Sequence, residues 1–227
     1  DSGWKVSVNT DDNPYVKVWR LEVFDLWIGD GRVISSDIRG GKDNAPYYNP
    51  VTDRLVCYDD CEYPIISSMP ALTVEIDGEC TIAPTTSSPA ISFQERGDVT
   101  SGTLTYVRAD DAQSASITLT ANGENNSAEP YKAIEGFSAA NITVGEGLYL
   151  KSHATMAEAL EATTVTIGDL TEYALIVGDV QVTDANAADV LGDGKVSFTV
   201  SGGQTAAPTY TLTLNGATIT APIKVGL

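Results

Sequence analysis

The stretch FDLWIGDGRVISS, residues 24 to 36, returns later in the chain as YALIVGDVQVTDA, residues 173 to 185. In both stretches apolar residues alternate along a short run, a glycine follows, and a second alternating run begins. A period of two is typical of a β-strand with one buried face, and glycine between two such runs is typical of a turn. The stretch therefore predicts a pair of short strands, and the chain contains it twice.

A second match follows the first in the same order. LVCYDDCEYPI (residues 55 to 65) lines up loosely with LTLNGATITAPI (residues 212 to 223). Because Val, Ile and Thr recur in most strands, a similar strand composition is the alternative explanation. Two ordered matches favour an internal repeat, which divides the chain into an N-terminal strand segment (1–23), a first β-rich module (24–172) and the opening of a second, incomplete module (173–227).

Most of the remaining chain has the same character. Runs such as ALTVEIDG, TLTYVRA, ASITLTA and KVSFTVSG alternate with period two, and short turn-rich segments separate them. The sequence predicts an all-β fold. Its many short strands with small corner residues favour a parallel β-solenoid-like stack with flanking antiparallel strands. A β-sandwich of antiparallel hairpins is the alternative. Only residues 152–163 have a helix-like pattern, which fits a short helix or a loop.

Charge restricts the partners of this chain. It has 31 acidic and 13 basic residues and a formal net charge of -18, which opposes binding to nucleic acid and to anionic lipid surfaces. No apolar run approaches the roughly 20 residues that a membrane-spanning helix needs. With one histidine, His153, a single chain cannot build a three-histidine zinc site. We therefore expect neither nucleic-acid binding nor membrane insertion.

Cysteine and aspartate residues provide weak candidate sites. Cys57 and Cys61 can form a disulfide if they face each other across a turn, whereas three buried thiols, including Cys80, are the alternative. Asp189 and Asp193 lie in DANAADVLGDG, which offers the oxygen ligands that calcium prefers but not the spacing of a calcium loop. Calcium is the one cofactor that we consider, and a turn made by the GDG segment is the alternative.

Aromatic residues are concentrated near the N-terminus. The loop NAPYYNP, residues 44 to 50, contains adjacent tyrosines between two prolines, and burying both side chains is difficult. Exposed aromatic rings are a common platform for sugars. The sequence therefore predicts a glycan-contacting loop with four candidate residues, Asn44, Tyr47, Tyr48 and Asn49.

The run YALIVGDVQVTDANAADVLGDGKVSF…YTLTLNGATI resembles a module found in tandem in secreted and cell-surface proteins of gut-type bacteria. The pattern of that module is roughly aromatic-x-LW-hydrophobic-x-G-x-x-VT-x-x-N, then GDG-x-V-x-[YF], then TLTLNNATI. The match covers residues 173–219. The first copy keeps FDLWIGDGRVISS but departs from the pattern after Ser36. The resemblance implies an extracellular or cell-surface bacterial protein with β-helical tendencies and no established catalysis.

These observations predict a non-enzymatic structural or adhesive surface module that assembles through strand addition into a filament. Its partners would be other copies of itself or further modules of the same chain. One alternative is a carbohydrate-binding module that uses the aromatic N-terminal region. Another is a β-helix polysaccharide lyase or hydrolase, for which Arg96, Asp98, Arg108, Asp110 and Asp111 are the charged candidates.

Overall fold

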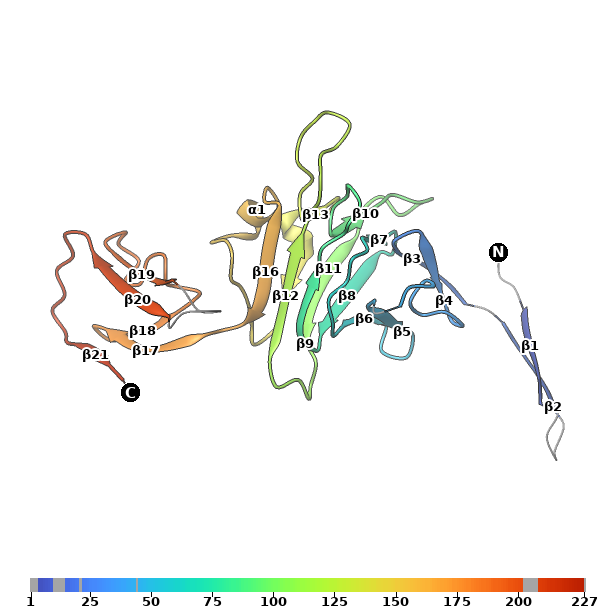
Figure 1. The fold of residues 1–227 in the computed structure, drawn as a ribbon, viewed down its shortest axis with the longest axis horizontal. Helices are drawn as coiled ribbons and strands as arrows, with labels where there is room; N and C mark the ends of the chain where they lie inside the picture. The colour runs from blue at the N-terminus through green and yellow to red at the C-terminus, as the bar shows by residue number, and fades with distance from the viewer. Residues whose placement is uncertain (1–3, 10–14, 21, 44, 202–207, 227) are drawn as a thin grey trace. The chain divides into compact units, whose positions relative to one another are not determined.

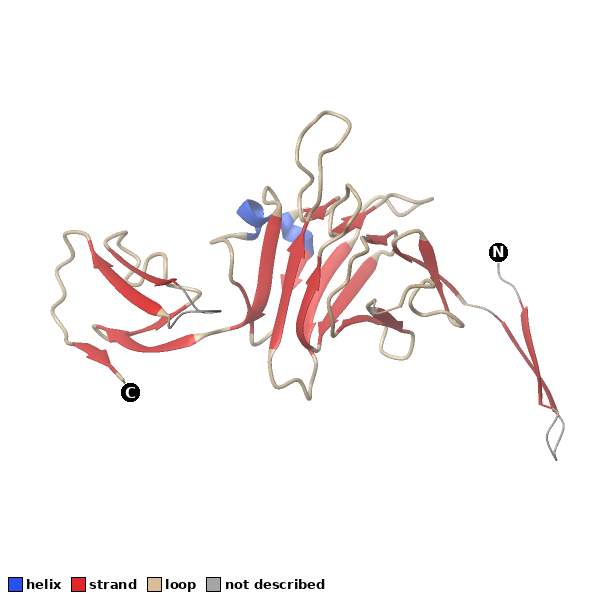
Figure 2. Cartoon of the chain, viewed as in Figure 1, coloured by secondary structure: helices blue, strands red, loops and turns tan. Residues whose placement is uncertain are grey.

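A computed structural model describes residues 4–9, 15–20, 22–43, 45–201 and 208–226, with the backbone alone for the first two strands. The prediction of an all-β fold is confirmed, because strands make up nearly all of the regular structure (Figure 2). The chain divides into two compact units, residues 1–168 and residues 169–227. These are called the first unit and the second unit.

The first unit consists mainly of short strands (Figure 1). They are β1 (Trp4–Asn9), β2 (Tyr15–Arg20), β3 (Val23–Ile28), β4 (Gly31–Ile34), β5 (Tyr47–Asn49), β6 (Arg54–Cys57), β7 (Ile65–Ser67), β8 (Ala71–Ile76), β9 (Gly78–Ile82), β10 (Ile91–Phe93), β11 (Thr103–Arg108), β12 (Ala115–Thr120), β13 (Ile134–Glu135), β14 (Ile142–Val144), β15 (Leu148–Leu150) and β16 (Thr164–Asp169). β1 and β2 pair with each other as an antiparallel hairpin.

The other strands of the first unit form three sheets. Their orders are β13-β10-β7-β3-β4, β14-β11-β8-β6-β5 and β15-β16-β12-β9. Strands that follow one another along the chain enter successive sheets, so β7, β8 and β9 are followed by β10, β11 and β12, each of which pairs in parallel with its counterpart. Antiparallel strands flank the parallel ones, with β3 on β7 and β16 on β12.

One continuous core fills the first unit. It receives alternate side chains from each parallel strand, such as Leu72, Val74 and Ile76 from β8. Each of these strands is too short to bury a core alone, so stacking on its neighbours supplies the burial. The helix-like window contains the one-turn helix α1 (Met156–Ala159), which begins with a capping box between Thr155 and Glu158. A 3₁₀ turn, η1 (Ala139–Asn141), precedes β14.

The second unit contains two small antiparallel sheets. The strands are β17 (Glu172–Val177), β18 (Val180–Thr183), β19 (Val196–Ser201), β20 (Thr209–Leu214) and β21 (Ile223–Val225). β17 pairs with β18 and β21, and β19 pairs with β20. Six buried side chains form its core: Leu175, Val177, Val182, Val190, Val196 and Phe198.

The repeated stretches form the same hairpin. β3 pairs with β4, and β17 pairs with β18, with an irregularity in the register at the same place. The paired residues are Val23 with Ile34, Trp27 with Arg32 and Ile28 with Gly31 in the first unit, and Glu172 with Thr183, Ile176 with Gln181 and Val177 with Val180 in the second. Each member of the second set lies 149 positions after its counterpart, as from Val23 to Glu172. Gly29 and Gly178 make the turns with φ of 63° and 64°, values that favour glycine.

The equivalence continues beyond the hairpins. β7 lies antiparallel on β3, and β21 lies antiparallel on β17. The next backbone contacts also correspond, since Ser68 N donates to Asp25 O at 2.8 Å and Gly226 N donates to Ala174 O at 2.9 Å. β5 and β6 correspond to β19 and β20, because Tyr48 is opposite Leu55 and Phe198 is opposite Leu212.

An aromatic pair occupies the same place in both copies. The rings of Phe24 and Tyr48 are 4.5 Å apart at 52°, and those of Tyr173 and Phe198 are 4.7 Å apart at 50°. The backbone N–H groups of Tyr48 and Phe198 donate to Ile38 O and Ala187 O respectively. Residues 22–68 and 171–226 are thus two copies of one local structure.

Candidate functional site

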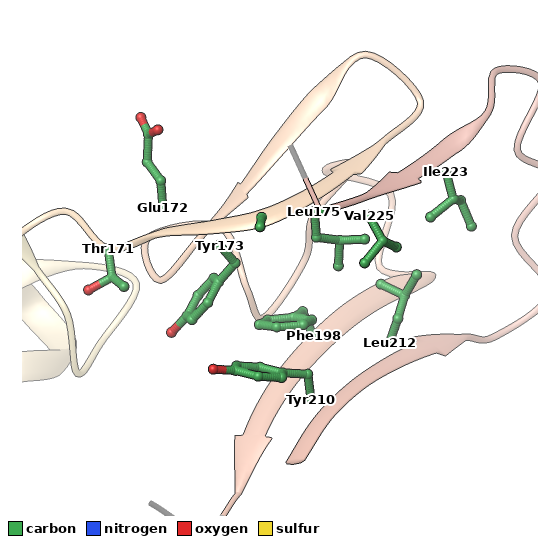
Figure 3. Close-up of a pocket in the computed structure, with 11 residues that line it drawn as sticks. Thr171, Glu172, Tyr173, Leu175, Phe198, Tyr210, Leu212, Ile223 and Val225 are labelled. Carbon is green, nitrogen blue, oxygen red and sulfur yellow. The ribbon is translucent and has the colours of Figure 1, made fainter. Parts of the chain in front are cut away.

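An apolar groove opens between the two sheets of the second unit. Its volume is about 590 Å³, and it is lined by Thr171, Glu172, Tyr173, Ala174, Leu175, Phe198, Tyr210, Leu212, Ile223, Val225 and Gly226. These residues come from β17, β19, β20 and β21 and from the positions next to them. Among the described residues that line the groove, Glu172 is the only charged one, and its side chain points away from the other labelled side chains in Figure 3.

Three rings form one end of the groove. Phe198 and Tyr210 stack at 6.1 Å with an angle of 12° between their planes, and Tyr173 approaches Phe198 at 4.7 Å and Tyr210 at 6.4 Å (Figure 3). Phe198 is buried, whereas Tyr210 is 59% exposed. A single layer of aromatic side chains therefore separates the second unit's core from the open space of the groove.

Leu212 on β20 and Ile223 and Val225 on β21 form the other end, and Leu214 lies two residues after Leu212 on the same side of β20. The exposed fraction is 49% for Leu214, 42% for Ile223 and 78% for Val225. The corresponding residues of the first unit, Cys57, Ile65 and Ser67, are each 0% exposed. The same local structure therefore has a covered apolar face in the first copy and an uncovered one in the second.

The first unit shows what covers this face. β8 pairs in parallel with β6 and places Val74 beside Leu55 and Ile76 beside Cys57. β10 pairs in parallel with β7 and places Ile91 beside Ile65. Among the described residues of the second unit, β20 pairs only with β19, and β21 pairs only with β17. Both therefore offer an unpaired edge with apolar side chains, which is a template for strand addition.

The lining has little chemistry besides apolar contact. It contains no histidine, cysteine, lysine or arginine, and Glu172 has no second carboxylate near it in the lining. General acid–base catalysis and metal binding both need polar groups that converge on one point. The lining therefore offers mainly apolar contact, next to the unpaired edges of β20 and β21.

The predicted glycan-contacting residues do not form an exposed platform. Tyr47 and Asn49 lie on β5 and are half-buried, whereas Tyr48 is 1% exposed and packs on Phe24. Asn44 lies outside the described residues. The two tyrosines are therefore not both buried, but Tyr48 faces the core, because period-two alternation within a strand sends one of two adjacent side chains inward.

The Tyr48 hydroxyl nevertheless has a partner. It hydrogen-bonds to the carboxylate of Asp53 in the turn between β5 and β6. Burial, followed by the Asp53 carboxylate, raises the pKa of this phenol above its ordinary value.

Asp189 and Asp193 act within the backbone of their loop. The Asp189 carboxylate accepts hydrogen bonds from the N–H groups of Asp193 at 3.1 Å and Gly194 at 2.9 Å, and the Asp193 carboxylate accepts one from Lys195 N at 3.0 Å. These contacts correspond to the turn that the GDG segment predicts as the alternative to calcium. Within the part of the chain that the structure describes, no three His, Cys, Asp or Glu side chains are grouped to hold a metal ion.

The three cysteines are buried free thiols in this structure, which corresponds to the alternative to a Cys57–Cys61 disulfide. Cys57 lies at the end of β6 and Cys80 on β9. A hydrogen bond with Cys80, together with burial, raises the pKa of Cys57. Burial also raises the pKa of Cys61, whose sulfur accepts a hydrogen bond from Tyr63 N at 3.4 Å.

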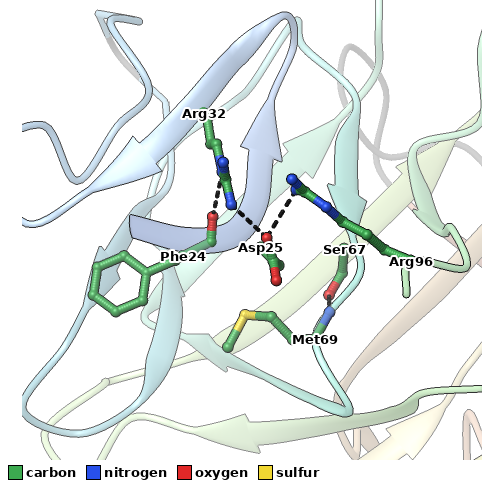
Figure 4. Close-up of polar contacts among 6 residues, drawn as sticks. All are labelled: Phe24, Asp25, Arg32, Ser67, Met69 and Arg96. Carbon is green, nitrogen blue, oxygen red and sulfur yellow. Dashed lines mark hydrogen bonds and ion pairs between the residues drawn. The ribbon is translucent and has the colours of Figure 1, made fainter. Parts of the chain in front are cut away.

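Asp25, Arg32 and Arg96 form a charged cluster at the surface of the first unit (Figure 4). Asp25 Oδ1 accepts hydrogen bonds from Arg32 at 2.5 Å and Arg96 at 2.8 Å, with the two guanidinium groups approaching from two sides. Both guanidinium groups lie 5.2 Å from the centre of a Trp27 ring. The equivalent positions of the second unit hold Ala174, Ile176 and Gln181.

This cluster joins β3 to the loop after β10, 71 positions apart in the chain. Sequence reasoning assigned Arg96 to a charged set for a lyase and missed Asp25, because no local pattern relates the two residues. β7 lies between β3 and β10 in the sheet, so the contact spans this strand.

No family model, curated protein or solved structure matches the chain. No helix among the described residues has both the length and the apolar character that crossing a membrane requires. The comparison that bears on function is therefore the one within the chain, between residues 22–68 and residues 171–226.

Proposed function

We propose that this chain is a non-enzymatic structural or adhesive module of an extracellular bacterial surface protein, and that it assembles through strand addition. The observation that carries the proposal is the uncovered face of the second unit. Exposed strand edges with apolar side chains favour pairing with another chain unless they are covered. A lining without paired carboxylates, histidine or cysteine supports a role in assembly over catalysis.

The proposal includes the architecture of the first unit. We infer that its parallel ladders constitute a short β-solenoid, in which each layer crosses three sheets and stacks on the layer before it. The pairing of β7 with β10, β8 with β11 and β9 with β12 supports this interpretation. A solenoid presents an open face at each end, and assembly then extends the stack.

Sedimentation velocity over a range of protein concentrations tests the assembly. We expect the apparent mass of the wild type to rise with concentration and Val225→Lys to weaken association about tenfold or more, which corresponds to about 1.4 kcal/mol. Lysine at this position would have to bury its ammonium group against the apolar groove on assembly. Val51→Lys is the matched control, since Val51 is 91% exposed, lies in the turn after β5 of the first unit and is not one of the residues that line the groove.

Wild-type protein that stays monomeric at every concentration would contradict assembly of the chain with itself. Equal association of the Val225→Lys and Val51→Lys variants would contradict the role of the groove.

A further inference from the structure

Among the described residues of the second unit, no strand takes the place of the strands that cover residues 22–68 in the first unit, and that cover has a defined form. In the first unit the chain runs from β7 through three residues into β8, which pairs in parallel with β6. β10 then returns to pair in parallel with β7. Two consecutive layers of strands thus cover the two edges that correspond to β20 and β21.

The side chains of this cover follow a regular pattern. Leu72, Val74 and Ile76 alternate along β8, and all three are buried, while Thr73 and Glu75 between them are only partly buried. On β10, Ile91 and Phe93 are buried on either side of Ser92. A register shift of one residue would place the polar set in the core, so the pattern fixes the pairing.

We propose that the groove of the second unit is a docking site for a polypeptide segment with the strand pattern of residues 70–93, which adds one strand in parallel to β20 and a second in parallel to β21. This inference rests on the proposed function and specifies the partner. The first added strand places apolar side chains beside Leu212 and Leu214. The second places them beside Ile223 and Val225.

The polarity of the groove favours this partner over a glycan. Its lining is mostly apolar, with hydroxyl groups on Thr171, Tyr173 and Tyr210, and Glu172 points away from the other labelled side chains (Figure 3). A sugar would need several convergent hydrogen-bonding side chains in addition to an aromatic ring. A strand satisfies its polar backbone by pairing with the unpaired edges of β20 and β21, and its apolar side chains cover the exposed leucine, isoleucine and valine.

The internal repeat supplies the test. Gly226 corresponds to Ser68 by its backbone contact, so residues 70–168 can be attached after Leu227 of the full chain as a second copy of the cover. We expect the amide groups of β20 and β21 to exchange with solvent at least about tenfold more slowly in the grafted chain than in the wild type, measured by hydrogen exchange and mass spectrometry. Leu214→Lys in the grafted chain should remove this protection, and Val51→Lys should leave it unchanged.

A second graft separates failure of the cover to fold from failure to dock. Residues 22–168, attached after Leu227, contain both the cover and the local structure that it covers in the first unit. Slow amide exchange in the strands of this longer graft would show that the attached cover folds. If the longer graft shows such protection and the graft of residues 70–168 leaves β20 and β21 unprotected, the proposal is overturned. Protection of β20 and β21 that persists with Leu214→Lys would also overturn it.

These outcomes are distinct from those for the proposed function. If the wild-type chain associates through Val225 but the graft leaves the groove open, the partner is a second copy in another geometry and this inference fails alone. If the graft covers the groove and the wild-type chain stays monomeric, association of the chain with itself fails and this inference stands.

Discussion

Ile65 and Ile223 occupy equivalent positions in two different environments, which makes a paired substitution informative. Ile65 lies on β7, is 0% exposed and pairs with Ile91 of the next layer. Ile223 lies on β21 and is 42% exposed. The residue type is the same and the antiparallel neighbours are equivalent, since Ile65 is opposite Ile28 and Ile223 is opposite Val177.

The magnitudes follow from burial. Ile→Ala at a fully buried position removes apolar contacts and leaves a cavity, so Ile65→Ala should lower the free energy of unfolding by about 2–5 kcal/mol. At Ile223 a large part of the side chain already contacts solvent, and the groove is open, so no closed cavity forms. We expect Ile223→Ala to lower the free energy of unfolding by about 1 kcal/mol or less, which is roughly half of the free energy gained by burying an isoleucine side chain.

Hydrogen exchange with mass spectrometry should follow each unit separately. Tryptophan fluorescence cannot do so, because Trp4, Trp19 and Trp27 all precede the second unit in the sequence. The measured quantity is the free energy of opening of β7 and β6 for Ile65→Ala, and of β21 and β20 for Ile223→Ala. Equal losses at the two positions, measured at a concentration where the protein is monomeric, would refute an uncovered groove.

Two further predictions concern buried polar groups of the first unit. Tyr106 is 0% exposed and its hydroxyl has no hydrogen-bond partner. Tyr106→Phe should therefore leave the free energy of unfolding unchanged in a urea titration or raise it by about 1 kcal/mol. A loss of more than about 1 kcal/mol would contradict the unpaired hydroxyl. The pKa values of Tyr106, Tyr48, Cys57 and Cys61 are all raised above ordinary values of 10.0 for tyrosine and 9.0 for cysteine. The fold favours their protonated forms, so this contribution to stability is complete below pH 9 and is lost as the pH rises further. The urea midpoint should therefore fall above pH 9, and native-state alkylation should leave Cys57 unmodified; a constant midpoint up to pH 11 would contradict this.

The repeated hairpin was predictable because its determinants are local. Alternating Phe24, Leu26 and Ile28, followed by Gly29, specify a strand and a turn within six residues. The turn depends on the φ of 63° at Gly29, which glycine adopts easily. The same local pattern around Gly178 gives the same hairpin with the same register irregularity.

The candidate site was only partly predictable. The alternating run TYTLTL forms β20, whose second edge is unpaired among the described residues. The groove itself did not follow from the sequence, because it forms where β17, β19, β20 and β21 meet, and their pairing depends on contacts between distant positions. Tyr48 shows the same limit, since its place in a strand and its contact with Phe24 decide its burial.

By itself, the sequence determined an all-β chain, its acidic character and the twofold use of one hairpin, because period-two alternation, net charge and glycine turns are local properties. Tertiary structure alone decided which copy is covered. Ile65 and Ile223 occupy equivalent positions in the two copies. The parallel pairing of β10 on β7 buries Ile65, whereas among the described strands β21 pairs with β17 alone and Ile223 stays exposed. Burial results from the stacking of layers far apart in the chain, so no local pattern can encode it.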